Sequence, residues 1–352
     1  VGLASIVGKL TWGSMSDRTG RELAYSLAFA CTLLSVGALV VAGRQPASIM
    51  PYVYAVLIGL GYAGTAPLTP AAASDLFAGP GFSTIFGSLH TLLCVGAAVG
   101  SWGAGMIFDW TESYAVALWV AAACAIIAPA LMWVAAPSRP HPAAVRNAQC
   151  PKSPPHSSFV PRHSLPLPPR RWHETGGLVT QAQVRSEHDS RGWVVVGAAF
   201  VTMALLYGLW YSYSVFLVAL LKEFGWSRSV TAGAFSMFAL VHAGVGPFFG
   251  PFAERVGPRR IIFAGGCMLA LGLLLAAETS QPWHLYLAFG FIAAIGIGFS
   301  GYVPLVILIR GWFPTRIGTA VGIATAGISM GIATLIPICQ FMIDEVGWRW
   351  AF

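Results

Sequence analysis

The feature that most constrains this chain is a series of long segments without charge. Residues 23–43 carry no charged side chain in 21 positions, and residues 115–136 carry none in 22. A helix of about 20 apolar residues spans the ~30 Å hydrocarbon core of a bilayer. Only 9% of the residues are charged, whereas a soluble domain has about a quarter. The chain is therefore expected to be an all-α, multi-pass membrane protein.

Ten such spans are predicted. They cover residues 1–16, 23–43, 50–74, 84–108, 115–136, 192–220, 229–252, 260–277, 284–309 and 317–343. Glycine is frequent within them, as is usual where membrane helices pack closely. The chain starts inside one span and stops at "GWRWAF" (347–352), where another can begin, so we expect both ends to be cut.

The distribution of Lys and Arg predicts an orientation. If the tract 13–22 is cytoplasmic, fifteen of these residues lie on the cytoplasmic side and four on the outer side. Positive residues accumulate in cytoplasmic loops, so the net charge of +7 follows from topology and requires no nucleic-acid partner. Residues 137–191 contain ten prolines and eight basic residues and are expected to form a disordered cytoplasmic linker. The plasma (inner) membrane is the expected location.

An internal repeat divides the chain into two similar halves. The charged tract "GSMSDRTGRE" (13–22) recurs as "GPFAERVGPR" (250–259), at an offset of 237 positions. At the same offset, the glycines at 59, 61 and 64 and Pro67 match the glycines at 296, 298 and 301 and Pro304. Both tracts fall on the same side of the membrane, so the repeat is parallel. Parallel repeats are a transporter architecture with the substrate site between the halves.

Both charged tracts resemble motif A of the major facilitator superfamily. The motif residues are Gly13, Asp17, Arg18, Gly20 and Arg21 in the first copy and Gly250, Glu254, Arg255 and Gly257 in the second. The resemblance implies that they gate alternating access, with Asp17 accepting hydrogen bonds from a neighbouring helix N-terminus and the arginines pairing with it. The second copy has Pro258 in place of Arg21. The alternative interpretation is a solvated turn whose arginines set the topology.

Further motifs resemble the monocarboxylate transporter and oxalate/formate antiporter group. "EFGWSRS" (223–229), "RGWFPTRIGTAVGI" (310–323) and "GWRWAF" resemble the N-terminal half of that group, whereas "SDLFAG" (74–79), "IFGSL" (85–89) and "AGMIFDWTESY" (104–114) resemble its C-terminal half. Residues 1–136 then correspond to helices eight to twelve, and 192–352 to helices one to five with the start of six. The halves are in reverse order. A fragment across two tandem transporter units, a permutation, or a conventional chain with the halves misassigned would each explain this order.

Lys9 is the candidate for binding an anionic substrate. It precedes Asp17 by eight residues, about 12 Å along a helix and near the membrane midplane. A cation there costs about 2.5 kcal/mol or more and needs a partner or a wet cavity. In the resembling group, a basic substrate-binding residue stands four residues before the motif glycine, as Lys9 does. The alternative is a lysine whose ammonium reaches the interface.

The other half offers Tyr207 and Tyr211, four residues apart on one helix face, as hydroxyl donors to a carboxylate; aromatic packing is the alternative. Animal members of the resembling group carry a proton-linked Asp where this chain has Ser5, which argues against direct proton coupling at that position. His90 and His242 remain as candidates for substrate or proton binding, although a membrane histidine can also serve helix packing. Arg310 is expected to anchor a cytoplasmic helix end.

The predicted function is secondary transport of small organic anions, mono- or dicarboxylates, by antiport or proton-coupled symport. A non-transporting sensor or a non-functional fragment is the alternative. No enzyme activity, cofactor or metal is expected: no nucleophile–base set is visible, and the six cysteines lack metal-ligand spacing.

Overall fold

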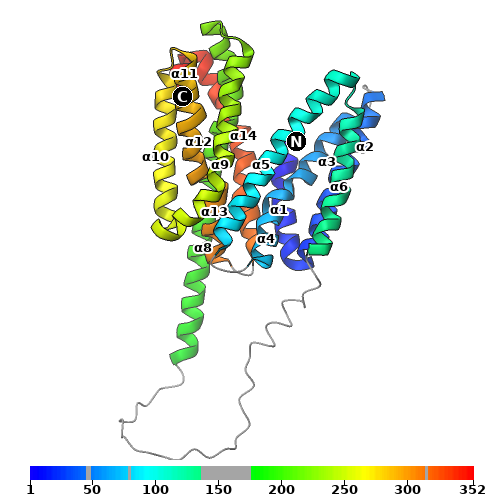
Figure 1. Ribbon diagram of the computed structural model, residues 1–352. Coiled ribbons are helices and arrows are strands. Elements are labelled where there is room, and N and C mark those ends of the chain that lie inside the picture. The colour runs from blue at the N-terminus through cyan, green and yellow to red at the C-terminus, as the bar shows by residue number, and fades with distance from the viewer. Residues whose placement is uncertain (45–48, 78–80, 136–175, 314–315) are drawn as a thin grey trace, which may run out of the picture.

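The computed structural model describes residues 1–44, 49–77, 81–135, 176–313 and 316–352, and every secondary-structure element in these ranges is helical. The helices form two bundles (Figure 1). The first bundle contains α1 (Gly2–Thr19), α2 (Arg21–Arg44), α3 (Met50–Ala63), α4 (Thr65–Leu76), α5 (Phe82–Thr111) and α6 (Ala115–Ala135). The second contains α8 (Gly176–Phe224), α9 (Arg228–Val256), α10 (Pro258–Ala277), α11 (Pro282–Leu285), the π-helical η1 (Tyr286–Ala293), α12 (Ala294–Ser300), α13 (Tyr302–Trp312), α14 (Ile317–Val346) and α15 (Trp348–Ala351).

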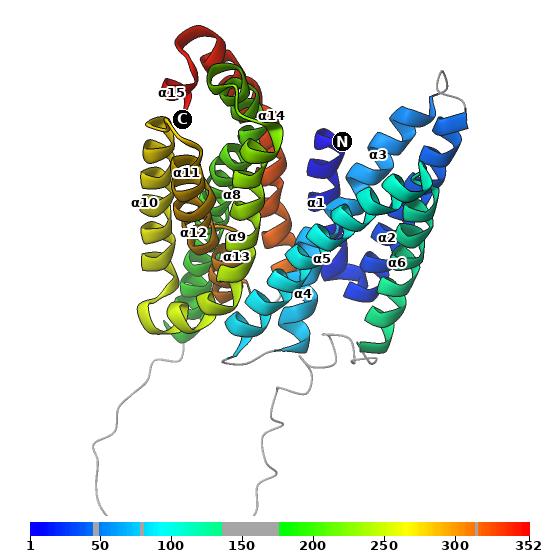
Figure 2. The same ribbon diagram turned by 45° about the horizontal axis from the view of Figure 1, so that its top comes forward.

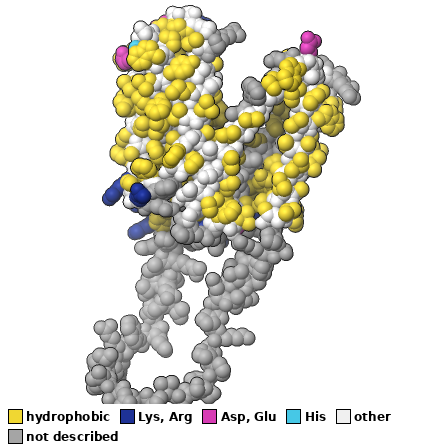
Figure 3. Space-filling view, viewed as in Figure 1, with side chains coloured by type: hydrophobic (Ala, Val, Ile, Leu, Met, Phe, Trp, Pro, Cys, Tyr) yellow, Lys and Arg dark blue, Asp and Glu magenta, His cyan; other side chains and the backbone are white. Residues whose placement is uncertain are grey.

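Each predicted span coincides with a helical segment. Within the described residues, eight segments are long and apolar enough to cross a membrane, with α3–α4 and α11–α13 each counting as one. The two others are α5, with a shorter apolar stretch over 82–97, and α1, which carries Lys9, Asp17 and Arg18. Large apolar side chains cover the outside of both bundles (Figure 3), for example Leu34, Val134 and Leu274, which are all more than half exposed. This surface suits lipid, and the chain is an integral, multi-pass membrane protein.

The repeat found in the sequence is a repeat of backbone geometry. α1 ends at Thr19 and α9 at Val256, and each is followed by a glycine with positive φ, +105° at Gly20 and +90° at Gly257. A residue with a Cβ atom strongly disfavours this conformation, so both turns need glycine. The next helices then start at equivalent positions, Arg21 and Pro258. Proline suits the first position of a helix, which explains why α10 tolerates it there.

A second pair of equivalent positions interrupts a membrane span. α3 passes into α4 at Gly64, and α12 passes into α13 at Gly301, 237 positions later. The longest equivalent helices, α5 and α14, both have 30 residues and start 235 positions apart. The two bundles are therefore copies of one unit.

The helical part of the second bundle starts earlier than the sequence indicates. α8 begins at Gly176, within the segment 137–191 that was predicted to be a disordered linker, and runs through the membrane span to Phe224. Residues 176–191 contain no proline, whereas the preceding part of the segment is rich in it, so a helix can extend this far. The remainder of the predicted linker lies outside the described residues.

The bundles meet at one end and diverge at the other (Figures 1 and 2). The most extensive contacts between them are two crossings, α1 on α14 and α5 on α9. The closed end carries the turns at Gly20 and Gly257 and is called the motif A end below. At the opposite end, the space-filling surface is hollowed between the bundles (Figure 3). Among the described residues, the space between the bundles therefore opens toward that end.

Candidate functional site

The α1–α14 crossing depends on glycine. A Cβ atom placed on Gly13 would collide with the backbone of Gly318, and one on Gly322 would collide with the carbonyl of Lys9. Small residues allow membrane helices to approach this closely. The close approach places the end of α1 against the beginning of α14.

At this crossing, Asp17 binds the N-terminus of α14. Its carboxylate accepts hydrogen bonds from the Gly318 amide (3.1 Å), the Thr319 amide (2.6 Å) and the Thr319 hydroxyl (2.6 Å). The first amides of a helix lack intrahelical partners, and the helix dipole favours an anion there. This contact joins the first bundle to the second, at the end where they are closed.

Arg21 holds that carboxylate in place. Its guanidinium donates to Asp17, to Ser16 (2.8 Å) and to Asp75 at the end of α4 (2.9 Å). Arg18, predicted to share this role, is exposed, and among the described residues no ion pair is found for it. In the second copy Arg255 is also exposed, and the side chain of Glu254 lies outside what the structure describes.

Contacts of α13 with α4 and α5 also join the two bundles at the motif A end. Arg310 on α13 donates to the Ser74 hydroxyl (2.8 Å), and its guanidinium carbon lies 3.8 Å from the ring centre of Phe82. Tyr302, at the start of α13, donates to the Ala66 carbonyl (2.6 Å). Arg310 therefore anchors a helix end, as expected, and it does so across the two bundles.

Lys9 lies in the α1–α14 crossing, two turns before Asp17. It is only 5% exposed, and its ammonium donates to the Ser329 hydroxyl (2.8 Å), which in turn donates to Ser5 (3.2 Å). Among the described residues, no carboxylate pairs with it. A buried ammonium whose hydrogen-bond partner among the described residues is one neutral hydroxyl still has donors left for an anion.

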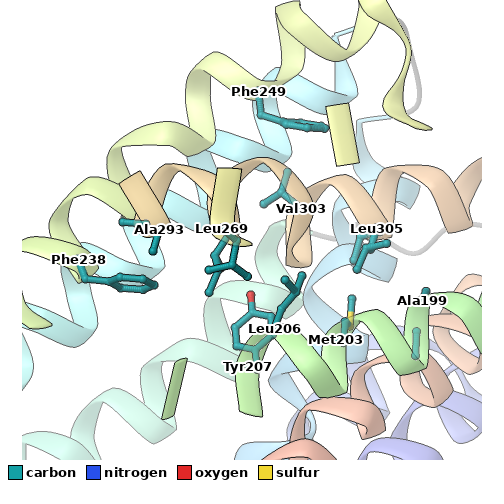
Figure 4. Close-up of a cluster of buried hydrophobic side chains, with 14 of the residues drawn as sticks. Ala199, Met203, Leu206, Tyr207, Phe238, Phe249, Leu269, Ala293, Val303 and Leu305 are labelled. Carbon is teal, nitrogen blue, oxygen red and sulfur yellow. The ribbon is translucent and has the colours of Figure 1, made fainter. Parts of the chain in front are cut away.

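The other predicted substrate residues gather around α8. Tyr207 is buried and extends from α8 into the apolar core (Figure 4), with its hydroxyl beside Gly301. Tyr211 is 43% exposed, and its ring lies 5.6 Å from that of Trp210. His90 on α5 lies 5.2 Å from Tyr302, measured between ring centres. In the described part of the chain these residues make no direct contact with Lys9, so the structure places two groups between the bundles rather than one.

Neutralising Asp17 is expected to open the motif A end. Asp17→Asn keeps the side-chain shape but removes the charge that holds the α14 amides, worth about 2 kcal/mol or about thirtyfold in the equilibrium between the closed and open states. The measurement is the distance between spin labels on cysteines placed at Phe77 and Gly311, at the ends of α4 and α13, with the six native cysteines replaced. Glu22→Gln is the matched control, because Glu22 lies at the start of α2, close in sequence to Asp17, and no contact with α14 is found for it. Equal label distances in both variants would contradict the gating role.

Two repeated helical bundles in a membrane, packed together at one end and parted at the other, have the architecture of a secondary transporter. The sequence pattern of the Major Facilitator Superfamily matches residues 1–202 and 198–352, so the chain belongs to this family. Curated relatives include monocarboxylate transporter 3 of Rattus norvegicus, 34% identical over 161 residues (46% of this chain, 33% of that protein), and monocarboxylate transporter 2 of Homo sapiens, 33% identical over 162 residues (46% and 34%). The chain thus spans about a third of the length of the curated relatives it matches. These relatives are transporters and not enzymes, as the sequence predicts.

Solved structures share the fold over nearly the whole chain. The human organic anion transporter MFSD10 superposes with a TM-score of 0.70 at 15% identity, covering 99% of this chain and 78% of that one. The proton:xylose symporter XylE reaches 0.68 at 14% identity, covering 99% and 80%. At these identities, the likeness establishes the fold alone.

Proposed function

We propose that this protein transports small organic anions, mono- or dicarboxylates, across the membrane by alternating access. The observation that carries the proposal is the buried Lys9 ammonium, bonded to the Ser329 hydroxyl and to no described carboxylate, at a crossing between the bundles. A carboxylate entering from the open end supplies the missing negative charge. The similarity to monocarboxylate transporters supports this substrate class.

In this proposal, the motif A end lies on the cytoplasmic side of the plasma membrane. Fifteen Lys and Arg residues are assigned to that side, and the exposed Arg255, Arg259 and Arg260 crowd the α9–α10 turn there. Figure 3 shows Lys and Arg side chains at this end and Asp and Glu side chains at the opposite one. The structure then corresponds to the outward-open state, and opening of the Asp17 and Arg310 contacts would lead to the inward-open state.

The proposal is tested by counterflow in liposomes that contain the purified chain. Vesicles loaded with unlabelled lactate, pyruvate, formate or oxalate are expected to accumulate the labelled anion, and the neutral amides of these acids are not expected to compete, because they bring no charge to Lys9. The initial rate of uptake against empty liposomes is the measurement. If no carboxylate shows counterflow, the transport proposal fails and the non-transporting sensor or fragment is favoured.

A further inference from the structure

The second crossing between the bundles, α5 on α9, is built like the first but carries different chemistry. A Cβ atom on Gly87 would collide with the carbonyl of Gly246. In the same way, a Cβ atom on Gly322 would collide with the carbonyl of Lys9. Gly246 is the repeat counterpart of Lys9, so this crossing has no lysine. One turn before Gly246, His242 occupies the place of Ser5, and one turn after Gly87, His90 occupies the place of Thr325. Two imidazoles therefore stand where the first crossing has the hydroxyls of Ser5 and Thr325.

These histidines face each other across the bundles. The ring centres of His90 and His242 are 5.8 Å apart, with the planes nearly perpendicular. His242 is 5% exposed, and its Nδ1 atom has no hydrogen-bond partner in the described part of the chain. The Nε1 of Trp210, whose ring lies 4.9 Å from that of His242, also has none. Buried polar atoms are almost always bonded, so the unpartnered Nδ1 of His242 is available to a proton, whereas the Trp210 indole, which can only donate, requires an acceptor.

The surroundings of the pair are uncharged but suit a cation. His90 contacts Cys94 on its own helix (3.7 Å) and Tyr302 on α13. The α8 helix presents Trp210 and Tyr207 to this region, and α9 presents Phe238, 6.3 Å from His242. Among the described residues, the further titratable groups that interact with Tyr207 here are the hydroxyls of Tyr62 and Tyr211. Aromatic rings attract a cation, whereas a second charge next to the first would be repelled, so the pair can hold one proton but not two.

We propose that the His90–His242 pair is the proton-binding site of the transport cycle. It takes the role of the carboxylate that is missing at the position of Ser5. This rests on the proposed function, to which it adds the pair of residues that binds the proton. The proton adds to an unprotonated ring nitrogen of the pair while the anion binds at Lys9. The site between the bundles then holds one net positive charge both when empty and when loaded. Each ligand favours binding of the other, because the anion offsets the charge that the proton brings.

The test separates exchange from proton-driven uptake. Liposomes containing the wild-type chain are expected to accumulate labelled lactate when the outside is made acidic, and to show counterflow at equal pH on both sides. For His242→Gln and His242→Asn, the ratio of gradient-driven uptake to counterflow is expected to fall at least about tenfold. His284→Gln, at the bundle end opposite motif A, is the matched control and should keep the wild-type ratio. His90→Gln is expected to lower the ratio as well.

The outcomes distinguish the two proposals. A wild-type chain that shows counterflow but ignores the pH gradient overturns the proton site and leaves anion transport intact. A wild-type ratio in either His242 variant overturns the proton site too. A role in helix packing alone would lower both rates together and leave their ratio unchanged. Absence of counterflow in the wild-type chain is the failure of the transport proposal itself.

Discussion

Lys9→Ala is expected to lower the kcat/KM for carboxylate counterflow at least about 100-fold. A bound anion would then be buried without a counter-charge, and losing one partner of a buried charge pair costs about 3–5 kcal/mol. Even the lower figure exceeds the ~2.7 kcal/mol that corresponds to 100-fold. The measurement is the initial rate of counterflow over a range of substrate concentrations.

Two further measurements identify the cause of that loss. The thermal stability of Lys9→Ala should equal or exceed that of the wild type, because a cation at the membrane midplane costs about 2.5–3.5 kcal/mol. Lys222→Ala, an exposed lysine in the last turn of α8, is the matched control and should transport normally. Lys9→Arg keeps the charge and should retain more activity than Lys9→Ala. A kcat/KM for Lys9→Ala within about threefold of the wild type would contradict the role of Lys9 as anion ligand.

The architecture could be predicted because it depends on local signals. A span of about 20 apolar residues has few alternatives to a membrane helix, and the turn at Gly20 needs a glycine that the second copy repeats at Gly257. The order of the halves is not decided by the fold, since the two bundles are copies and each crossing has its counterpart. The reverse order therefore stays a prediction.

Contacts between the bundles are harder to predict, except where the repeat offset itself indicates them. Tyr302 bonds Ala66 and Arg310 bonds Ser74, and both pairs are 236 positions apart, one less than the repeat offset. Helices beside the rotation axis of a repeat contact their own copies, so the offset itself was a signal for this pair of contacts. By contrast, Ser329 as the partner of Lys9 and the meeting of His90 with His242 depend on helix rotation, which apolar spans do not reveal.

Closing of the motif A end is expected to fail when Gly13 is enlarged. In Gly13→Leu, the new side chain must occupy the space of the Gly318 backbone, which cannot rotate away as a side chain can. Overpacking a tight contact costs about 1–3 kcal/mol or more, and here the two bundles can relieve it by separating. The spin-label distance between Phe77 and Gly311 should therefore increase, and counterflow should fall to about 1% of the wild-type rate, which corresponds to ~2.7 kcal/mol against the closed state.

The contrast with another membrane glycine makes this prediction specific. A Cβ atom on Gly37 of α2 would meet no atom within 4 Å, so Gly37→Leu should leave the label distance and the transport rate unchanged. Gly13→Ala adds only one carbon and should give an intermediate shift. Because opening at this end does not disturb the packing within either bundle, the helical content of Gly13→Leu should remain that of the wild type. If Gly13→Leu keeps the closed distance, the α1–α14 crossing has room to spare and is not what holds the two bundles together.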